Sequence, residues 1–510
     1  MQSNEDFLDW RTEFEQRIRG FRNLREDQGI ETDLQENAEL PDFNPVFYDR
    51  AGEPSKINWE GLQNYCRACG YIRHSPAEGI YVLYKFNFKT GYYEKLSMDT
   101  FSMNLAVQLK EYYPSLSLGT TFIGRVASEI FPSLRDSTDL CPSSESTLQM
   151  MYSSGEMIPF SNGIYSFMTN KLLPRTSYIF IEHPLNVAFN PDALSNPIRQ
   201  RYLDMMCGDE ELFELLFEQL GYAMYARTFT VPTCTILYGG GSNGKSIVSD
   251  MVKKIVGPKN TSSLSMCDMN TAFALAQAEG KLINIATDTA SGFGTNDFAT
   301  SDVREFIKKS TSGEMHTFNP KNGKVHEGYG PRKFIFATNV TLNFGGMDGG
   351  MARRLYTIPF RATFVPDAAV EAEFFMKDAE EWFAMQALIS MMCMVRRKMK
   401  GREFSTPYLD GCYLSSSVAK CLKAEQMAAN DTVLDWISED LDLDFLDRDE
   451  VRKALIGTAS LYETYCRFCN ESKRTPKTRN SFTTTMKNTY GLTMKRTRRD
   501  NERVYVTEGA

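Results

Sequence analysis

Gly239-Gly-Gly-Ser-Asn-Gly-Lys-Ser246 is the stretch of this 510-residue chain on which its fold depends. It fits the phosphate-binding pattern G-x-x-x-x-G-K-[ST]. Residues 233–238 before it are apolar and β-prone, and residues 247–256 after it have the apolar spacing of a helix. A strand that runs into a glycine loop and then a helix N-terminus can surround phosphate oxygens with backbone N–H groups. This context disfavours the alternative, a chance match in a glycine turn.

The pattern also assigns chemistry to individual residues. Lys245 is expected to reach the β- and γ-phosphates, and Ser246 to bind Mg²⁺. The sequence therefore predicts ATP and Mg²⁺ as cofactors. The expected nucleotide contacts are Gly239, Gly241, Asn243, Gly244, Lys245, Ser246 and Ile247.

Two further segments follow in the order that such a site requires. Lys281-Leu-Ile-Asn-Ile-Ala-Thr-Asp288 is an apolar strand that ends in a carboxylate, which would belong to the Mg²⁺ shell. Lys333-Phe-Ile-Phe-Ala-Thr-Asn339 is another apolar strand, and its terminal amide would hold the attacking water or sense the γ-phosphate. Each strand alone is weak evidence, but their order after a phosphate loop makes them reinforce each other.

A pair of arginines, Arg353 and Arg354, precedes one more apolar strand. They are either surface residues in salt bridges or arginine fingers that reach the nucleotide of a neighbouring subunit. A guanidinium in the second role stabilises charge in the transition state. That role requires an oligomeric ring.

The composition is that of a globular protein, with a length that suggests about three or four domains. No apolar run approaches the length of a membrane span, so no membrane partner is expected. The first residues have neither the basic start nor the apolar core of a signal peptide. The eleven scattered cysteines fit reduced thiols. We therefore expect a cytoplasmic protein.

The net charge of −8 argues mildly against nucleic acid, but the distribution of charge points the other way. Residues 431–450 hold nine acids and one base, whereas residues 471–510 hold ten bases and four acids. The basic run follows a helix–turn–helix-like pattern, which favours DNA contact over a merely solvated face. The candidate DNA-binding residues in this run are Lys495, Arg496, Arg498 and Arg499.

The run Leu237–Ser246 resembles the Walker A motif of the superfamily 3 helicases of DNA viruses and phages, in particular the branch of poxvirus and phage primase-helicases. Other stretches resemble further parts of that family. These are Ile158-Pro-Phe-Ser-Asn-Gly163 for the start of its helical domain, Lys281–Asp288 for Walker B, Phe336–Asn339 for its sensor, Arg353-Arg354 for its finger pair, and 460–505 for its winged helix.

The resemblance implies an α/β chain built on a P-loop AAA+-like ATPase core. It also implies a ring, expected to be hexameric, that translocates on single-stranded DNA and unwinds forked DNA by ATP hydrolysis during viral or phage replication. The expected divisions are an N-terminal helix and linker (1–40), a small α/β module (41–148), a helical domain (149–228), the ATPase core (229–365), a helical segment (366–425) and a winged-helix-like domain (426–510).

The sequence departs from the family in two places. The second acid expected two residues after Asp288 is replaced by Ala290, so Asp288 either works alone or shares its task with a base located elsewhere. The basic motif that follows Gly313 is altered as well. In such rings a hairpin here holds DNA in the pore, which makes His316, Lys321 and Lys324 candidate DNA contacts, although an ordinary solvated hairpin is an equal alternative.

Three other functions stay open beside the helicase. They are an ATP-gated DNA-binding or loading ATPase that does not unwind, the helicase part of a primase-helicase system, and a nucleotide-binding scaffold without turnover. The first 150 residues show no primase motif, so a priming enzyme or polymerase is expected as a separate partner. The pairs Cys66/Cys69 and Cys466/Cys469 are interpreted as buried thiols on helices rather than zinc ligands. Residues 4–25 have the spacing of an amphipathic helix.

Overall fold

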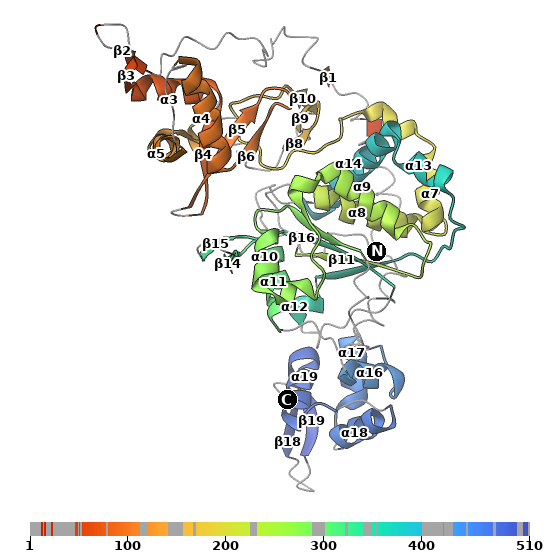
Figure 1. Cartoon of the computed structure of the whole chain (residues 1–510). Helices are drawn as coiled ribbons and strands as arrows, with labels where there is room; N and C mark the ends of the chain where they lie inside the picture. The colour runs from red at the N-terminus through yellow and green to blue at the C-terminus, as the bar shows by residue number, and fades with distance from the viewer. Residues whose placement is uncertain are drawn as a thin grey trace.

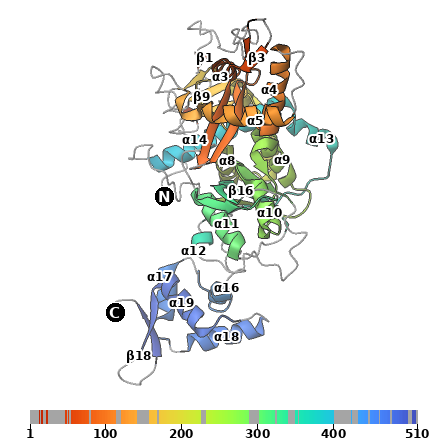
Figure 2. The same ribbon diagram turned by 60° about the vertical axis from the view of Figure 1, so that its left-hand side comes forward.

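A computed structural model of the chain gives a mixed α/β fold. A central body built on a parallel sheet lies between an N-terminal body and a C-terminal body (Figures 1 and 2). The residues that the structure describes are 12–13, 15–16, 22–23, 46–48, 50, 54–77, 80–112, 120–140, 157–166, 170–224, 232–287, 301–321, 325–339, 349–352, 354–399, 422, 432–444, 447–458, 460–472, 476–496 and 503–507.

The central sheet has five parallel strands in the order β12-β13-β16-β11-β17. Their bounds are Cys234–Tyr238 (β11), Thr261–Ser262 (β12), Ile283–Ala286 (β13), Lys333–Thr338 (β16) and Leu355–Pro359 (β17). Every residue of β13 and β16 is buried, as expected for strands that are covered on both faces. The strand predictions over 281–288 and 333–339 are confirmed, and β11 lies at the position expected before the glycine loop.

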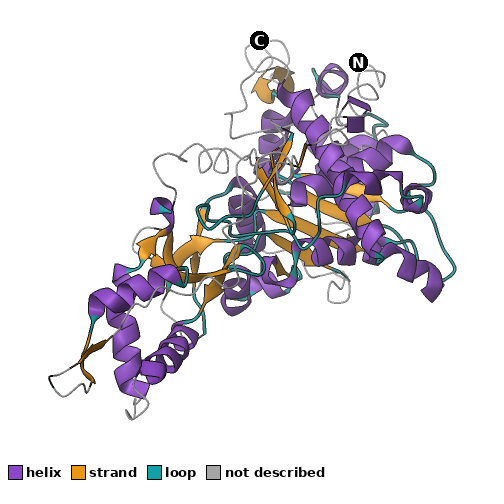
Figure 3. Ribbon diagram, turned by 90° about the horizontal axis from the view of Figure 1, so that it is seen from above, coloured by secondary structure: helices purple, strands orange, loops and turns teal. Residues whose placement is uncertain are grey.

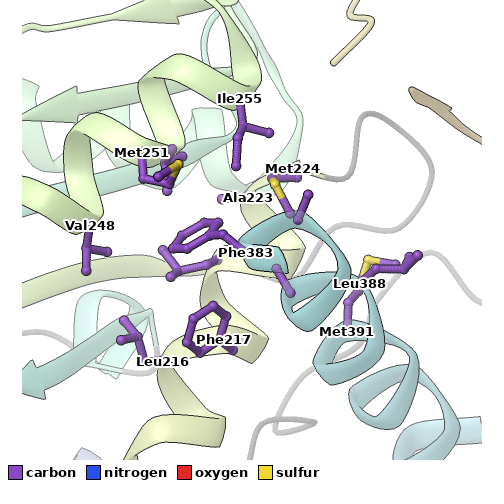
Figure 4. Close-up of a cluster of buried hydrophobic side chains, with 14 of the residues drawn as sticks. Leu216, Phe217, Ala223, Met224, Val248, Met251, Ile255, Phe383, Leu388 and Met391 are labelled. Carbon is purple, nitrogen blue, oxygen red and sulfur yellow. The ribbon is translucent and has the colours of Figure 1, made fainter. Parts of the chain in front are cut away.

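Helices cover both faces of this sheet, so its side chains alternate between two cores (Figure 3). On one face Leu237 and Ile335 pack against helices α8, α9 and α14, whose interlocking side chains are drawn in Figure 4. On the other face Ile236 and Phe336 pack against α11 and α12. The helices are Glu210–Met224 (α8), Lys245–Val256 (α9), Ala272–Leu275 (α10), Ser301–Ser312 (α11), Gly349–Ala352 (α12), Ala368–Phe374 (α13) and Lys377–Met399 (α14), preceded by Ile198–Met205 (α7).

The N-terminal body contains two four-stranded sheets and the two-stranded sheet β2-β3 among the described residues. One four-stranded sheet has the strand order β6-β5-β4-β7 and packs against α3, α4 and α5, and the other has the order β1-β10-β9-β8. The strands are Arg22–Asn23 (β1), Val46–Tyr48 (β2), Pro54–Ile57 (β3), Tyr71–Ala77 (β4), Ile80–Asn87 (β5), Tyr92–Leu96 (β6), Arg135–Asp136 (β7), Met157–Phe160 (β8), Gly163–Ser166 (β9) and Lys171–Leu173 (β10). The helices are Trp59–Ala68 (α3), Met98–Tyr112 (α4) and Thr120–Ile130 (α5). The hairpin predicted across Lys89-Thr-Gly91 is confirmed as β5–β6.

The C-terminal body consists of helices followed by an antiparallel pair of strands. Its core is aromatic, with Trp436, Tyr465 and Phe482 fully buried and within ring contact of one another. The elements are Thr432–Glu439 (α16), Arg448–Leu455 (α17), Leu461–Glu471 (α18), Arg479–Tyr490 (α19), Leu492–Arg496 (β18) and Arg503–Thr507 (β19).

Some local predictions differ from the structure. The segment 158–163, expected at the start of a helical domain, lies in the β8–β9 hairpin. The acidic run 440–444 lies between α16 and α17, with Leu441 and Leu443 packed against the core of this body. The single helix expected over 369–400 is two helices, α13 and α14. Of the helix predicted over 4–25, residues 12–13 and 15–16 are helical, residues 22–23 form strand β1 instead, and the rest lies outside the described residues.

Candidate functional site

The glycine loop connects β11 to α9 and owes its close packing to the absence of side chains. A Cβ atom on Gly239 would lie 2.2 Å from the carbonyl oxygen of Phe360, and one on Gly244 would lie 2.5 Å from the sulfur of Met205. Gly244 has a φ of +92°, which disfavours residues with a side chain, and it caps the N-terminus of α9. The loop is thus held tightly between the ends of β17 and α7.

Two side chains of the loop are buried within it. The Lys245 ammonium donates to the carbonyl oxygens of Gly239 at 2.7 Å and Gly240 at 2.6 Å, and to Oδ1 of Asn243 at 3.0 Å. The Asn243 amide uses its other end as well, because Nδ2 donates to the carbonyl oxygen of Phe360 at 3.2 Å. Asn243 therefore connects the lysine and the loop to Phe360, the residue directly after β17.

The carboxyl ends of neighbouring strands meet beside this loop. Thr287 follows β13 and Asn339 follows β16, which is the direct neighbour of β11. Both line a cavity of about 520 Å³ together with Ser246. The carboxyl edge of a parallel sheet is where ligands bind in open α/β folds. Asp288, the next residue after Thr287, lies outside the described residues.

The opposite wall of the cavity was not predicted from the sequence. It comes from the end of α7 and from the segment that joins β17 to α13, and the backbone N–H of Phe364 donates to the carbonyl oxygen of Ser242 at 2.7 Å. Its residues are Arg201, Asp204, Met205, Phe364, Val365, Pro366, Asp367, Val370, Glu371 and Phe374. The cavity therefore has a polar end at the glycine loop and an opposite wall on which apolar side chains such as Phe364 and Phe374 lie among charged ones. No sequence pattern points to these residues.

Arg354 occupies a different place from the one expected. Its guanidinium is buried and donates to the Thr311 hydroxyl at 2.9 Å, the Ser312 hydroxyl at 2.7 Å, and the carbonyl oxygens of Gly350 at 2.6 Å and Lys308 at 3.4 Å. These groups belong to the last turn of α11 and to α12 of the same chain. Arg354 is therefore neither a surface salt-bridge residue nor a side chain presented to a neighbouring subunit. Arg353 lies outside the described residues.

The segment after Gly313 forms the predicted hairpin, with strands Met315–Phe318 (β14) and His326–Tyr329 (β15). His316 does not face solvent as a phosphate contact would. It packs against Phe306 and shares a hydrogen bond of 2.8 Å with the Ser310 hydroxyl. Burial lowers its pKa to about 4, so the ring is neutral near pH 7 and carries no charge for a phosphate. Lys321 is exposed at the hairpin tip, and Lys324 lies outside the described residues.

The basic candidates of the C-terminal body belong to its hairpin. Lys495 is exposed on β18, and Arg496 ends that strand opposite Arg503. Arg498 and Arg499 lie outside the described residues. Lys495 and Arg496 are consecutive residues at the end of β18, and we call this pair the basic edge.

The two C-x-x-C pairs lie on, or directly after, helices α3 and α18. Within the described residues, no group of three or more His, Cys, Asp or Glu side chains could hold a metal ion. Burial raises the pKa of the Cys66 thiol to about 12, which keeps it protonated. The interpretation as buried thiols holds for Cys66, Cys69 and Cys469, while Cys466 is half-buried. In the part of the chain that the structure describes, none of the helices is both long and apolar enough to cross a bilayer.

Comparison with known proteins gives two findings. The profile of a family of unknown function (DUF5906) matches residues 237–354, the stretch from the end of β11 to Arg354. Among solved structures, the chain is similar to an apo A form of the C-terminal region of NrS-1, at 13% identity and a TM-score of 0.45, covering 88% of this chain and 98% of that one. Another apo structure of the same region has 13% identity and a TM-score of 0.44, covering 89% and 100%. No curated protein matches the chain.

Proposed function

We propose that the chain is an ATP hydrolase whose turnover drives work on DNA. One observation carries the ATPase proposal. Thr287 and Asn339 directly follow the neighbouring strands β13 and β16, and they line one cavity with Lys245, which begins α9 after the loop that follows β11. A lysine on a glycine loop, a polar residue on the adjacent strand and a helix N-terminus are the parts that phosphoryl transfer from a nucleoside triphosphate needs.

The proposed roles follow from position. Backbone N–H groups at the start of α9 would hold phosphate oxygens, and Lys245 would turn from its carbonyl acceptors to the β- and γ-phosphates. The Asn339 amide, at the end of β16, would orient the attacking water. Asp288 follows Thr287 directly, so we assign it the role of carboxylate base at this edge of the sheet.

The oxygen donors of the cavity fit Mg²⁺, which prefers hydroxyl, carboxylate and water ligands. Ser246 is exposed to the cavity at the first turn of α9. Ser246 and Asp288 are the residues that would hold the ion. When bound, Mg²⁺ neutralises the charge that develops between the β- and γ-phosphates.

For the work on DNA, we propose unwinding by a homo-oligomeric ring, with six subunits as the first expectation and a separate primase or polymerase as partner. The support is the likeness of the motifs to superfamily 3 helicases, the hairpin β14–β15 beside the ATPase body, and the basic edge at Lys495 and Arg496. An ATP-gated loader that does not unwind is the second candidate, because the same site would serve both activities.

A strand-displacement assay on forked DNA separates these two candidates. We expect the wild-type chain to release the labelled strand only when ATP and Mg²⁺ are both present. The matched control replaces ATP by a non-hydrolysable analogue, which should support DNA binding without displacement. ATP hydrolysis with DNA binding but no displaced strand would favour the loader over the helicase.

The basic edge of the C-terminal body predicts a specific salt dependence. Replacing Lys495 and Arg496 together by alanine should weaken duplex binding and reduce the slope of log K against log salt by about 0.9 for each lost phosphate contact. Fluorescence anisotropy at several salt concentrations measures this slope. Lys453→Ala, which removes an exposed charge from α17 of the same body, is the control and should leave it unchanged. Equal slopes for the wild type, the double variant and Lys453→Ala would mean that Lys495 and Arg496 face solvent and do not contact DNA phosphates.

A further inference from the structure

A second cavity, of about 660 Å³, lies where the N-terminal body meets the central body. One side comes from the β5–β6 hairpin, whose sheet lies beside the central body in both views (Figures 1 and 2). The other side comes from the central body, at residues 256–260 and 279–281. Ser161, Arg175 and residues 182–186 complete the lining. We call this cavity the interbody cleft. Its size is within the range of small-molecule sites.

Three cationic side chains line the interbody cleft without a carboxylate partner among the described residues: Lys95, Arg175 and Lys281. The Lys281 ammonium donates to the carbonyl oxygen of Lys259 at 2.7 Å. The Arg175 guanidinium donates from Nη1 to the carbonyl oxygen of Thr90 at 2.5 Å, and its buried Nε has no hydrogen-bond partner in the described structure. The interbody cleft thus gathers positive charge from three separate segments.

The carboxylates that line the same cleft already interact with other groups. Glu94 lies 3.4 Å from the Lys259 ammonium, and Glu279 lies 2.7 Å from Nε2 of His326. Glu182 accepts from the Tyr84 hydroxyl at 3.4 Å and lies 3.6 Å from His183. Each acid is therefore directed at a partner of its own, and none of the three makes a direct contact with Lys95, Arg175 or Lys281 among the described residues.

The two lysines also repel each other. Burial lowers the pKa of Lys281, and the nearby Lys95 ammonium lowers it further. Holding two like charges together across two bodies costs free energy that an anion placed between them would recover. The carbonyl oxygen of Lys259, which accepts from Lys281, cannot offset this repulsion because it carries no net charge.

We propose that the interbody cleft binds a phosphate group, with Lys95, Lys281 and Arg175 as its contacts. Phosphate matches the arrangement because it is multiply charged and accepts several hydrogen bonds, including one from the unpaired Arg175 Nε. The group would belong either to a single-stranded nucleic acid backbone or to a free nucleotide. Because the cations come from both bodies, the bound phosphate would join the N-terminal body to the central body. This site goes beyond the proposed ATPase site and shares no lining residue with it.

The test uses the full chain with Lys245→Ala, so that binding at the glycine loop does not contribute. Lys95→Glu and Lys281→Glu are added together, and the control adds Lys171→Glu, an exposed lysine on β10 outside the interbody cleft. Fluorescence anisotropy measures the binding of two probes, a fluorescent single-stranded oligonucleotide and a fluorescent ATP analogue. Pyrophosphate is then added as an unlabelled competitor. A second variant, Lys95→Gln with Lys281→Gln, removes charge without adding acids to the cleft.

We expect the Lys95 and Lys281 variants to bind one of the two fluorescent probes at least about tenfold more weakly than the control does. The affinity of the control should be unchanged. Pyrophosphate should compete with that probe only in the control. If the oligonucleotide is the weakened probe, its salt slope should also fall by about 0.7 for each lost contact, and the source is a nucleic acid backbone. If only the ATP analogue is weakened, the source is a nucleotide. Equal affinities of the cleft variants and the control for every probe, with unchanged melting curves, would overturn the proposal.

Discussion

Replacing Lys245 by alanine is expected to reduce ATP turnover by about 10²- to 10³-fold or more, the loss typical for one preorganised electrostatic contact to a transition state. Lys245 has the only charged side chain in the stretch 239–246, and its ammonium is held in the loop by Gly239, Gly240 and Asn243, from which it would turn to a bound phosphate. Alanine keeps the helical start of α9 but provides no cation.

The measurement is steady-state release of phosphate at saturating ATP and Mg²⁺. Lys253→Ala on the same helix is the matched control, because its ammonium pairs with Asp250 at the surface and should be dispensable. Asp288→Ala should match the loss in Lys245→Ala if that carboxylate is the base. Turnover near the wild-type rate in Lys245→Ala, with a folded chain by circular dichroism, would remove the ATPase proposal.

Arg353→Ala is expected to reduce turnover by about 10³- to 10⁵-fold, the effect of an arginine delivered in trans in assisted GTPases. Arg353 is replaced alone because Arg354 has a structural role. The buried Arg354 guanidinium binds the end of α11 in its own chain, so its loss would disturb the fold. Arg353 precedes it directly and is the residue of the pair that we propose for the neighbouring nucleotide. Wild-type activity should then rise faster than linearly with protein concentration around the assembly point.

Mixing two inactive variants tests the same idea more sharply. Lys245→Ala subunits keep Arg353, and Arg353→Ala subunits keep an intact loop, so mixed assemblies should regain part of the turnover. The control mixture pairs Arg353→Ala with Lys245→Ala, Arg353→Ala double mutants, which offer no arginine and should give no recovery. Strictly linear activity and no recovery on mixing would show that Arg353 acts within its own subunit.

The parts of the site that are continuous in sequence could be predicted, and those assembled from distant segments could not. The loop, β13, β16 and Asn339 follow from local patterns, because a phosphate loop requires a strand before it and a helix after it. The wall formed by Phe364 and its neighbours has no local pattern. It reaches the cavity only because the backbone after β17 returns to the loop at Ser242.

Charged residues were the hardest to interpret from sequence. Arg354 and His316 were expected to reach a nucleotide or DNA, a role that requires an accessible side chain. Both are instead satisfied by hydroxyl groups at the end of α11, Arg354 by Thr311 and Ser312 and His316 by Ser310. The serine and threonine residues of α11 do not show in the sequence which side chain they will bind. Thr311, for example, accepts from Arg354, which is 43 positions away in the chain.

The amide of Asn243 changes how the glycine loop should be compared with other sequences. The pattern G-x-x-x-x-G-K-[ST] treats position 243 as open to any residue. Here its acceptor holds Lys245 and its donor holds the carbonyl oxygen of Phe360, which is 117 positions away in the chain. Aspartate, though nearly the same in shape, keeps the acceptor and lacks the donor. In this architecture the free position of the pattern is therefore a constrained one. Because the acceptor at 360 is a main-chain oxygen that any residue provides, the constraint falls on position 243 alone.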